Sequence, residues 1–124
     1  LTYASAGLNV PPLIVRGDGF VEEMDIIGFP ICKFGNFYSG DYVDRTIKLN
    51  KGDKILFYTD GLVDAVNSKG QKFSQDRLKK VLLENSIKTG DDMIKAIERS
   101  LFDFIDTSML KDDMTFFVMD IKHF

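Results

Sequence analysis

The sequence predicts a single mixed α/β domain, of the α+β kind, in which short strands come first, helices follow and one strand closes the chain. Its 124 residues are enough for one domain but not for two. Up to residue 59 the apolar runs are strand-sized and separated by glycine and proline. After residue 74 apolar residues recur at helical spacing, and a last apolar run at residues 114–121 returns to the strand pattern. We therefore expect residues 1–124 to form one domain.

The composition excludes several classes of protein. Hydrophobic residues make up 44% of the chain and include 11 phenylalanines, which is too much apolar surface for a disordered segment. The net charge is -3 and the charges are interspersed, so a nucleic-acid partner has no support. No apolar run approaches the roughly 20 residues of a membrane span, and we expect no membrane contact by this segment. The single cysteine, Cys32, excludes an internal disulfide and fits a reducing compartment, so we expect a cytoplasmic location.

The first half of the chain predicts strands joined by turns. Two short apolar runs flank Gly17-Asp18-Gly19 and are typical of a β-hairpin. The run at residues 54–59 is the most apolar, which indicates a strand buried on both faces. Glycine and proline make residues 28–40 irregular. The predicted strands are residues 1–6, 13–16, 20–24, 42–49 and 54–59, with a turn at residues 50–53.

The second half predicts helices. One or two helical turns are expected at residues 62–66. Ser74 is in a position to cap a clear helix, with Phe73 and Leu78 as a hydrophobic staple around its start. Thr89 is expected to cap a second helix, whose first turn carries two aspartates. The apolar stripe predicted for this second helix consists of Ile94, Ile97, Leu101, Phe104 and Ile105.

An aspartate directly follows the most apolar strand, in Thr59-Asp60-Gly61. A carboxylate there lies at a sheet edge on a rigid support, and Gly61 lets the backbone turn sharply and a ligand approach closely. The alternative is that Asp60 caps the short helix that follows. Spacing alone leaves both interpretations open.

A second acidic segment, Asp112 and Asp113, precedes the last strand, where the alternative is a solvated turn. If the strands at residues 54–59 and 115–121 are antiparallel neighbours, Asp60 and Asp112 lie at the same edge of one sheet. Oxygen ligands of this kind suit Mg²⁺ or Mn²⁺. The only histidine, His123, is at the chain end, so nothing favours zinc. The sequence therefore predicts a site for a hard divalent cation.

These motifs resemble those of SpoIIE/RsbU-type protein phosphatases of the metal-dependent PPM family. Lys51-Gly52-Asp53 leads through an apolar strand to Thr59-Asp60-Gly61 and then to Asp64-Ala65, as in the family signature. Lys111-Asp112-Asp113-Met114-Thr115 is similar to the closing DD-x-T motif of the family. Two further segments resemble the family, namely Tyr3-Ala4-Ser5-Ala6-Gly7 with Pro11-Pro12, and Gly28-Phe29-Pro30-Ile31. The match runs across the whole chain in the family's order.

The resemblance implies a PPM-phosphatase-like antiparallel β-sandwich flanked by helices, of which residues 1–124 would be the C-terminal part. It implies that Asp60 and Asp112 are catalytic metal ligands and that Asp64 helps to bind an additional, weaker metal ion. Thr59, Gly61 and Asp113 would support these ligands. The two-metal site for Mn²⁺ or Mg²⁺ would be completed by residues outside this chain, so we expect the isolated chain to be weakly active or inactive.

The implied function is hydrolysis of phosphoserine or phosphothreonine on a protein, with a STAS-type anti-sigma-factor antagonist of a bacterial partner-switching pathway as the expected substrate. Ser5 and Leu8 stand where the family has Asn and His. They motivate the alternative of a catalytically degenerate phosphatase-like module that binds a regulatory protein partner. A small-molecule sensor domain without catalysis is a second alternative. We also expect the chain to begin inside a larger polypeptide, and unpaired strand edges to favour a homodimer, through residues 1–6.

Overall fold

The computed structural model describes residues 1–28, 42–106 and 113–122. Within these ranges the chain forms a four-stranded antiparallel sheet, with the strand order β3-β2-β5-β6, and a two-stranded ribbon of β1 and β4. The strands are β1 (Thr2–Tyr3), β2 (Leu13–Val15), β3 (Val21–Glu23), β4 (Arg45–Thr46), β5 (Lys54–Tyr58) and β6 (Phe116–Asp120). The helices are α1 (Asp60–Val63), α2 (Ser74–Glu84) and α3 (Gly90–Ile105).

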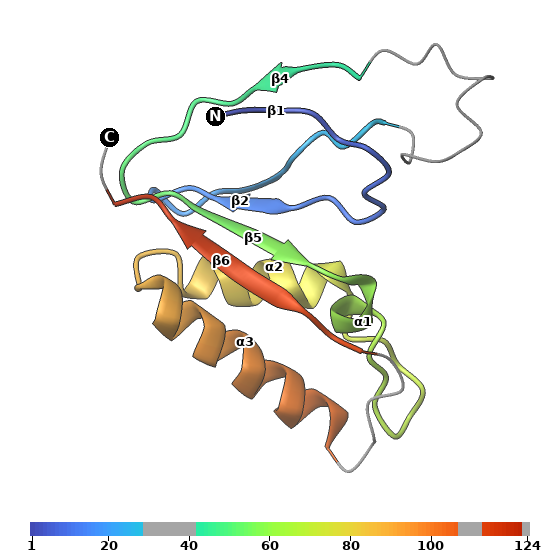
Figure 1. The fold of residues 1–124 in the computed structure, drawn as a ribbon. Coiled ribbons are helices and arrows are strands. Elements are labelled where there is room, and N and C mark those ends of the chain that lie inside the picture. Colours follow the sequence, from blue (N-terminus) through green and yellow to red (C-terminus); the bar gives the residue numbers. More distant parts are fainter. Residues whose placement is uncertain (29–41, 107–112, 123–124) are drawn as a thin grey trace, which may run out of the picture.

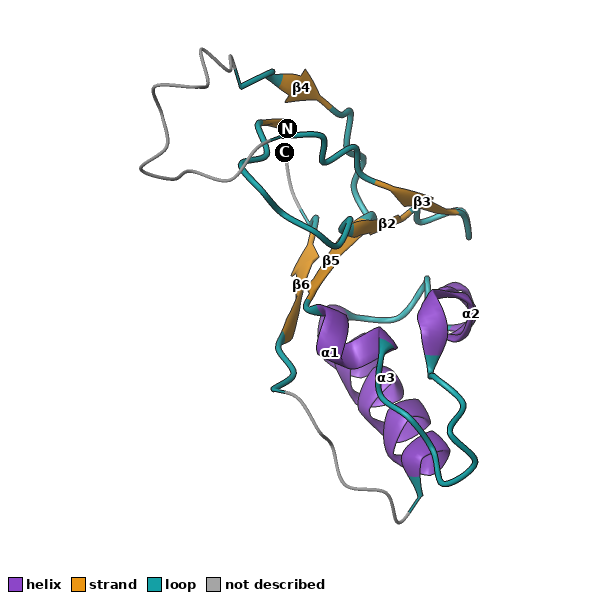
Figure 2. Cartoon of the chain, turned by 90° about the vertical axis from the view of Figure 1, so that its right-hand side faces the viewer, coloured by secondary structure: helices purple, strands orange, loops and turns teal. Residues whose placement is uncertain are grey.

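These elements form layers. The helices cover one face of the four-stranded sheet and the ribbon of β1 and β4 lies over the opposite face (Figure 1). The view turned by 90° shows the same order, with the sheet between the ribbon and the helices (Figure 2). The expected fold class is thereby confirmed: a mixed α+β fold with antiparallel sheets face to face and helices outside.

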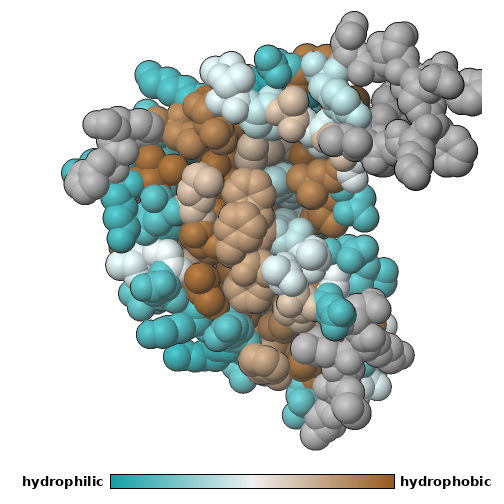
Figure 3. Space-filling model, viewed as in Figure 1, coloured by the Kyte–Doolittle hydropathy of each residue, from teal (hydrophilic) through white to brown (hydrophobic). Residues whose placement is uncertain are grey.

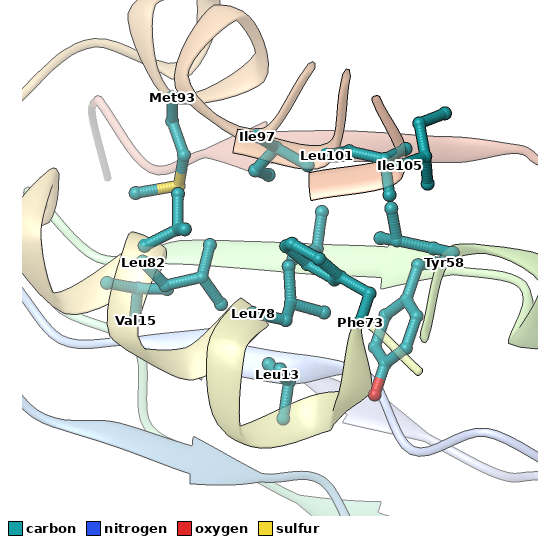
Figure 4. Packing of buried hydrophobic residues seen from close by; sticks show 13 residues of the cluster. Leu13, Val15, Tyr58, Phe73, Leu78, Leu82, Met93, Ile97, Leu101 and Ile105 are labelled. Carbon is teal, nitrogen blue, oxygen red and sulfur yellow. The ribbon is translucent and has the colours of Figure 1, made fainter. Parts of the chain in front are cut away.

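Strand β5 is buried on both faces, as its continuous apolar run predicts. Leu56 and Tyr58 belong to the main core cluster beneath the helices, whereas Ile55 belongs to a smaller cluster on the ribbon side. Figure 4 shows how side chains from the sheet, α2 and α3 meet in the main cluster. A central strand with this much burial gives a fixed support to the residues that follow it.

The hairpin and the turns are confirmed, but the ribbon strands are shorter than predicted. Gly19 in the β2–β3 turn has a φ of +91°, a conformation that favours glycine. The strands predicted at residues 1–6 and 42–49 pair over two residues each. Beside these strands, the Leu1 amino group donates to the Ile47 carbonyl and the Ile47 N–H donates to the Leu1 carbonyl.

Helix α2 begins at Ser74 as predicted, but the prediction that Ser74 caps it is wrong. Ser74 has a φ of 72°, Phe73 occupies the N-cap position, and no side-chain hydrogen bond caps the helix. Phe73 is only 1% exposed, and its N–H donates to the carbonyl of Ala65 at 2.7 Å. Tertiary packing of Phe73 therefore fixes the start of the helix.

Helix α3 starts as predicted, because Thr89 Oγ1 accepts a hydrogen bond from the Asp92 N–H at 3.2 Å. Its buried stripe differs in part from the prediction, which placed Ile94 and Phe104 in it; both are only half-buried. The buried residues follow a strict four-residue spacing and are Met93, Ile97, Leu101 and Ile105. No helix in the described ranges is long and apolar enough to cross a membrane.

Candidate metal centre

The end of β5 meets the start of β6 at one edge of the sheet. The two strands pair antiparallel from Lys54↔Asp120 to Tyr58↔Phe116. One residue beyond, the Thr59 N–H donates to the carbonyl of Thr115 at 2.9 Å. The predicted antiparallel neighbourhood of these strands is therefore confirmed, and Asp60 and the residues that lead into β6 share this edge.

Asp60 is the first residue of α1 and is exposed. Thr59, not Asp60, occupies the N-cap position, and no side-chain hydrogen bond caps the helix. The alternative that Asp60 caps α1 is therefore wrong. No hydrogen bond or ion pair joins the Asp60 carboxylate to any residue in the described part of the chain. Gly61 follows it directly and is buried.

Asp64 lies one helical turn after Asp60, at the C-cap of α1, where its N–H donates to the Asp60 carbonyl at 2.9 Å. Its carboxylate is 3.1 Å from the Nζ of Lys72. The Asp64 side chain is 45% exposed and that of Lys72 is 64% exposed, so this ion pair contributes little to stability. Apart from this weak ion pair, no described residue holds the Asp64 carboxylate.

Asp113 is exposed, two residues before Thr115 and thus close in sequence to the point where β6 meets β5. Asp112 lies outside the described residues, so its proximity to Asp60 remains a prediction. Among the described residues no group of three or more His, Cys, Asp or Glu side chains could hold a metal ion. The described part of this edge offers individual carboxylates rather than a complete set of metal ligands.

Comparison with known proteins identifies the family. The model of the family described as Stage II sporulation protein E (SpoIIE) matches residues 1–122. The chain belongs to the SpoIIE family. Protein IcfG of Synechocystis sp. (strain ATCC 27184 / PCC 6803 / Kazusa) is 28% identical over 116 residues, which are 93% of this chain and 17% of IcfG.

Two solved structures show the same fold. One contains the RsbU and RsbW domains of Rv1364c from Mycobacterium tuberculosis, with 25% identity, a TM-score of 0.68, and coverage of 98% of this chain and 32% of that one. The other contains the PP2C phosphatase domain and a fragment of the regulatory domain of SpoIIE from Bacillus subtilis, with 20% identity, a TM-score of 0.73, and coverage of 98% and 34%. This SpoIIE-family chain thus spans well under half the length of these relatives.

The donor atoms at the Asp60 edge of this SpoIIE-family chain fit a hard divalent cation. Asp60 and Asp113 offer exposed carboxylate oxygens, and Asp64 offers another that is held by one exposed lysine. Oxygen donors of this kind match Mg²⁺ and Mn²⁺ rather than Zn²⁺. Two or three carboxylates are fewer ligands than such an ion needs without water or further donors. The described residues therefore have the donor chemistry of such a site but do not by themselves form one.

A carboxylate that the sequence indicated only as part of a turn is the most buried one in the described ranges. Asp53 is 2% exposed and accepts hydrogen bonds from Arg16, from the Gly17 N–H and from the Asn50 N–H. It lies at the opposite end of β5 from Asp60 and joins the β2–β3 turn to β5. The sequence signal for this role is weak: a lone arginine at the end of a predicted strand.

Proposed function

We propose that this chain forms part of a metal-dependent phosphatase that hydrolyses phosphoserine or phosphothreonine on a protein. One observation carries the proposal: the antiparallel β5–β6 pairing brings Asp60, exposed and without a partner among the described residues, to the edge where the segment containing Asp113 enters β6. Membership of the SpoIIE family and the shared fold with a PP2C phosphatase domain support it.

Each residue at this edge has a distinct task in the proposed reaction. Asp60 and, by the family resemblance, Asp112 would hold the metal, and Asp64 would hold a further ion in place of Lys72. When bound, divalent cations of this kind supply an activated water nucleophile and neutralise charge on the phosphoryl oxygens. The remaining ligands come from residues outside this chain.

The expected substrate is a phosphorylated STAS-type antagonist of an anti-sigma factor. The structure from Mycobacterium tuberculosis joins RsbU and RsbW domains in one protein, which supports a role in partner switching. A purified phosphorylated STAS protein should therefore be a better substrate for the full-length protein than an unrelated phosphoprotein. Equal rates on both would contradict this substrate class.

The decisive experiment measures hydrolysis of a chromogenic phosphate ester by the full-length protein with and without Mn²⁺. Asp60→Asn removes a ligand charge but keeps the side-chain shape, so turnover should be lost. Asp91→Asn is the matched control, because Asp91 is an exposed helix-start residue and its loss should leave turnover intact. Near-normal turnover by Asp60→Asn would refute the metal assignment. Robust turnover by residues 1–124 alone would show that no ligand outside the chain is needed.

The alternative function, a degenerate phosphatase-like module that binds a regulatory protein, has its own observation. Ser5 and Leu8 replace polar family residues and line an apolar cavity of about 460 Å³ between the ribbon and the sheet. Ser5 Oγ is buried and has no hydrogen-bond partner within the described part of the chain. Absence of metal-dependent turnover in the full-length wild type would favour this alternative.

The homodimer is predicted through residues 1–6, and β6 offers a second candidate surface beside that cavity. Phe117 and Met119 of β6 are 53% and 40% exposed, and Phe117 stacks on Phe57 with ring centroids 4.7 Å apart. Figure 3 shows hydrophobic residues gathered along the middle of this face. Exposed apolar surface at an open strand favours association. Light scattering of the 124-residue chain should show a dimer, and a monomer at high concentration would contradict it.

A further inference from the structure

The β5–β6 ladder ends in an unusual pair, Thr59 and Thr115. The Thr59 N–H donates to the Thr115 carbonyl at 2.9 Å, as in a regular antiparallel pair. The reciprocal bond does not use the Thr59 carbonyl. The Thr115 N–H donates instead to Thr59 Oγ1 at 3.0 Å, and this hydroxyl lies 3.3 Å from the Thr115 carbonyl, to which it donates.

The structure shows why the side chain replaces the backbone at this point. The Thr59 carbonyl already accepts a hydrogen bond from the Leu62 N–H at 3.1 Å, at the beginning of α1. It therefore points along the helix and away from β6. Without the Thr59 hydroxyl, the Thr115 N–H would have no partner in β5. The Thr59 backbone carbonyl can therefore take part in α1, while the Thr59 hydroxyl keeps the start of β6 bonded to the end of β5.

We infer that Thr59 is a positioning residue of the metal centre, whose hydroxyl holds the segment containing Asp113 in place beside Asp60. This inference rests on the proposed metal-dependent phosphatase function. Thr59 stands next to Asp60 in the chain, and Thr115 stands two residues after Asp113. The hydrogen bonds between the two threonines therefore set how Asp60 and Asp113 lie with respect to each other.

Substitutions of Thr59 can separate its positioning role from a general contribution to the stability of the fold. Thr59 is exposed, so water can replace part of the lost bonding and the fold as a whole should survive a substitution. Valine has the shape of threonine but no hydroxyl, so Thr59→Val leaves the Thr115 N–H without its acceptor. Serine keeps the hydroxyl, so Thr59→Ser should restore the bond.

The test uses the full-length protein and two readouts that do not depend on turnover. The first is the Mn²⁺ affinity, measured by titration calorimetry. The second is hydrogen exchange of the Thr115 amide in the metal-free protein. Thr46→Val is the matched control, because Thr46 Oγ1 also contacts another hydroxyl, that of Thr2 at 3.3 Å, but in the β1–β4 ribbon. Both readouts are compared for Thr59→Val, Thr59→Ser and the control.

Thr59→Val should weaken Mn²⁺ binding and speed Thr115 exchange by about tenfold each, the factor expected for the loss of one hydrogen bond. Thr59→Ser and Thr46→Val should both behave like the wild type. If the wild type binds Mn²⁺ and Thr59→Val binds it equally well, this inference is overturned and the proposed function stands. If the wild type binds no Mn²⁺, the proposed function fails and the inference with it.

Discussion

The buried carboxylate of Asp53 makes the sharpest prediction about stability. Arg16 donates to Asp53 Oδ2 at 2.7 Å, the Asn50 N–H donates to the same oxygen at 2.8 Å, and the Gly17 N–H donates to Oδ1 at 3.1 Å. The side chains of Asp53 and Arg16 are 3% and 19% exposed. Asp53→Asn keeps the shape but replaces one accepting oxygen with an NH₂ group that faces N–H donors.

The expected loss of stability follows from these contacts. Leaving one member of a buried ion pair without its partner costs about 3–5 kcal/mol. Arg16 keeps two other acceptors, Glu22 and the Lys48 carbonyl, which lowers this cost. We therefore expect Asp53→Asn to lower the free energy of unfolding by about 2–4 kcal/mol, a large part of the roughly 5–15 kcal/mol typical of a domain.

The same hydrogen bonds to Asp53 also predict how the stability of the fold depends on pH. Burial alone would raise the pKa of the Asp53 carboxyl, but hydrogen bonds from the Asn50 N–H, from Arg16 and from the Gly17 N–H outweigh it and hold this pKa below its ordinary value. A carboxyl with a depressed folded-state pKa stabilises the fold above its unfolded pKa, about 3.9, and loses this contribution as the pH falls through the folded-state pKa. The difference between wild type and Asp53→Asn should therefore be full at neutral pH and shrink below about pH 4.

Urea unfolding of the 124-residue chain, followed by circular dichroism at neutral and acidic pH, measures both effects. Asp25→Asn is the matched control, because Asp25 also pairs with an arginine, Arg45 at 2.9 Å, but its side chain is 52% exposed. Its substitution should leave the unfolding midpoint nearly unchanged. An Asp53→Asn midpoint equal to that of the wild type at neutral pH, or a difference that persists undiminished in acid, would refute the charge-based role of Asp53.

Two further substitutions test local geometry by the same unfolding measurement. Thr89→Ala should lower the free energy of unfolding by about 1 kcal/mol, because the Asp92 N–H loses its acceptor. Thr89→Ser keeps the hydroxyl and should lower it much less. Equal losses in the two variants would argue against the cap. Gly28→Ala should cost about 1–3 kcal/mol, because a Cβ there would lie 2.0 Å from the Ser5 carbonyl oxygen. At Gly17 the nearest atoms would be 3.4 Å from the new Cβ, so Gly17→Ala is the milder control, and a larger loss there would contradict the crowding argument.

The parts of the fold that the sequence predicted correctly depend on signals that lie close together in the chain. The apolar run of β5 and the Gly-Asp-Gly turn of the hairpin each sit within a few residues. The position of Asp60 follows from the same local pattern, because a strand must end where its apolar run ends. The antiparallel neighbourhood of β5 and β6 is not a local signal; it entered as the condition under which Asp60 and Asp112 could share one ion.

The features that the sequence did not reveal depend on contacts between distant residues. Arg16 and Asp53 are 37 residues apart, and nothing local distinguishes Asp53 from an ordinary turn aspartate. Lys54 opens an apolar strand as a charged residue, yet it is only 4% exposed, because its Nζ donates to the Ser86 carbonyl at 3.0 Å. Ser74 has the right chemistry for a cap, but the packing of Phe73 sets the backbone there instead.

The two ends of β5 carry aspartates with opposite consequences for stability. Asp53 is buried and fully bonded, so its charge stabilises the fold and its removal should be costly. Asp60 is exposed, lacks a partner among the described residues, and lies one turn from the like charge of Asp64. No hydrogen bond or ion pair among the described residues depends on its carboxylate, so Asp60→Asn should leave the unfolding midpoint of the metal-free protein unchanged or slightly raise it. A clear loss of stability in Asp60→Asn would mean that Asp60 serves the fold, and a carboxylate that serves the fold would not be free to bind a metal.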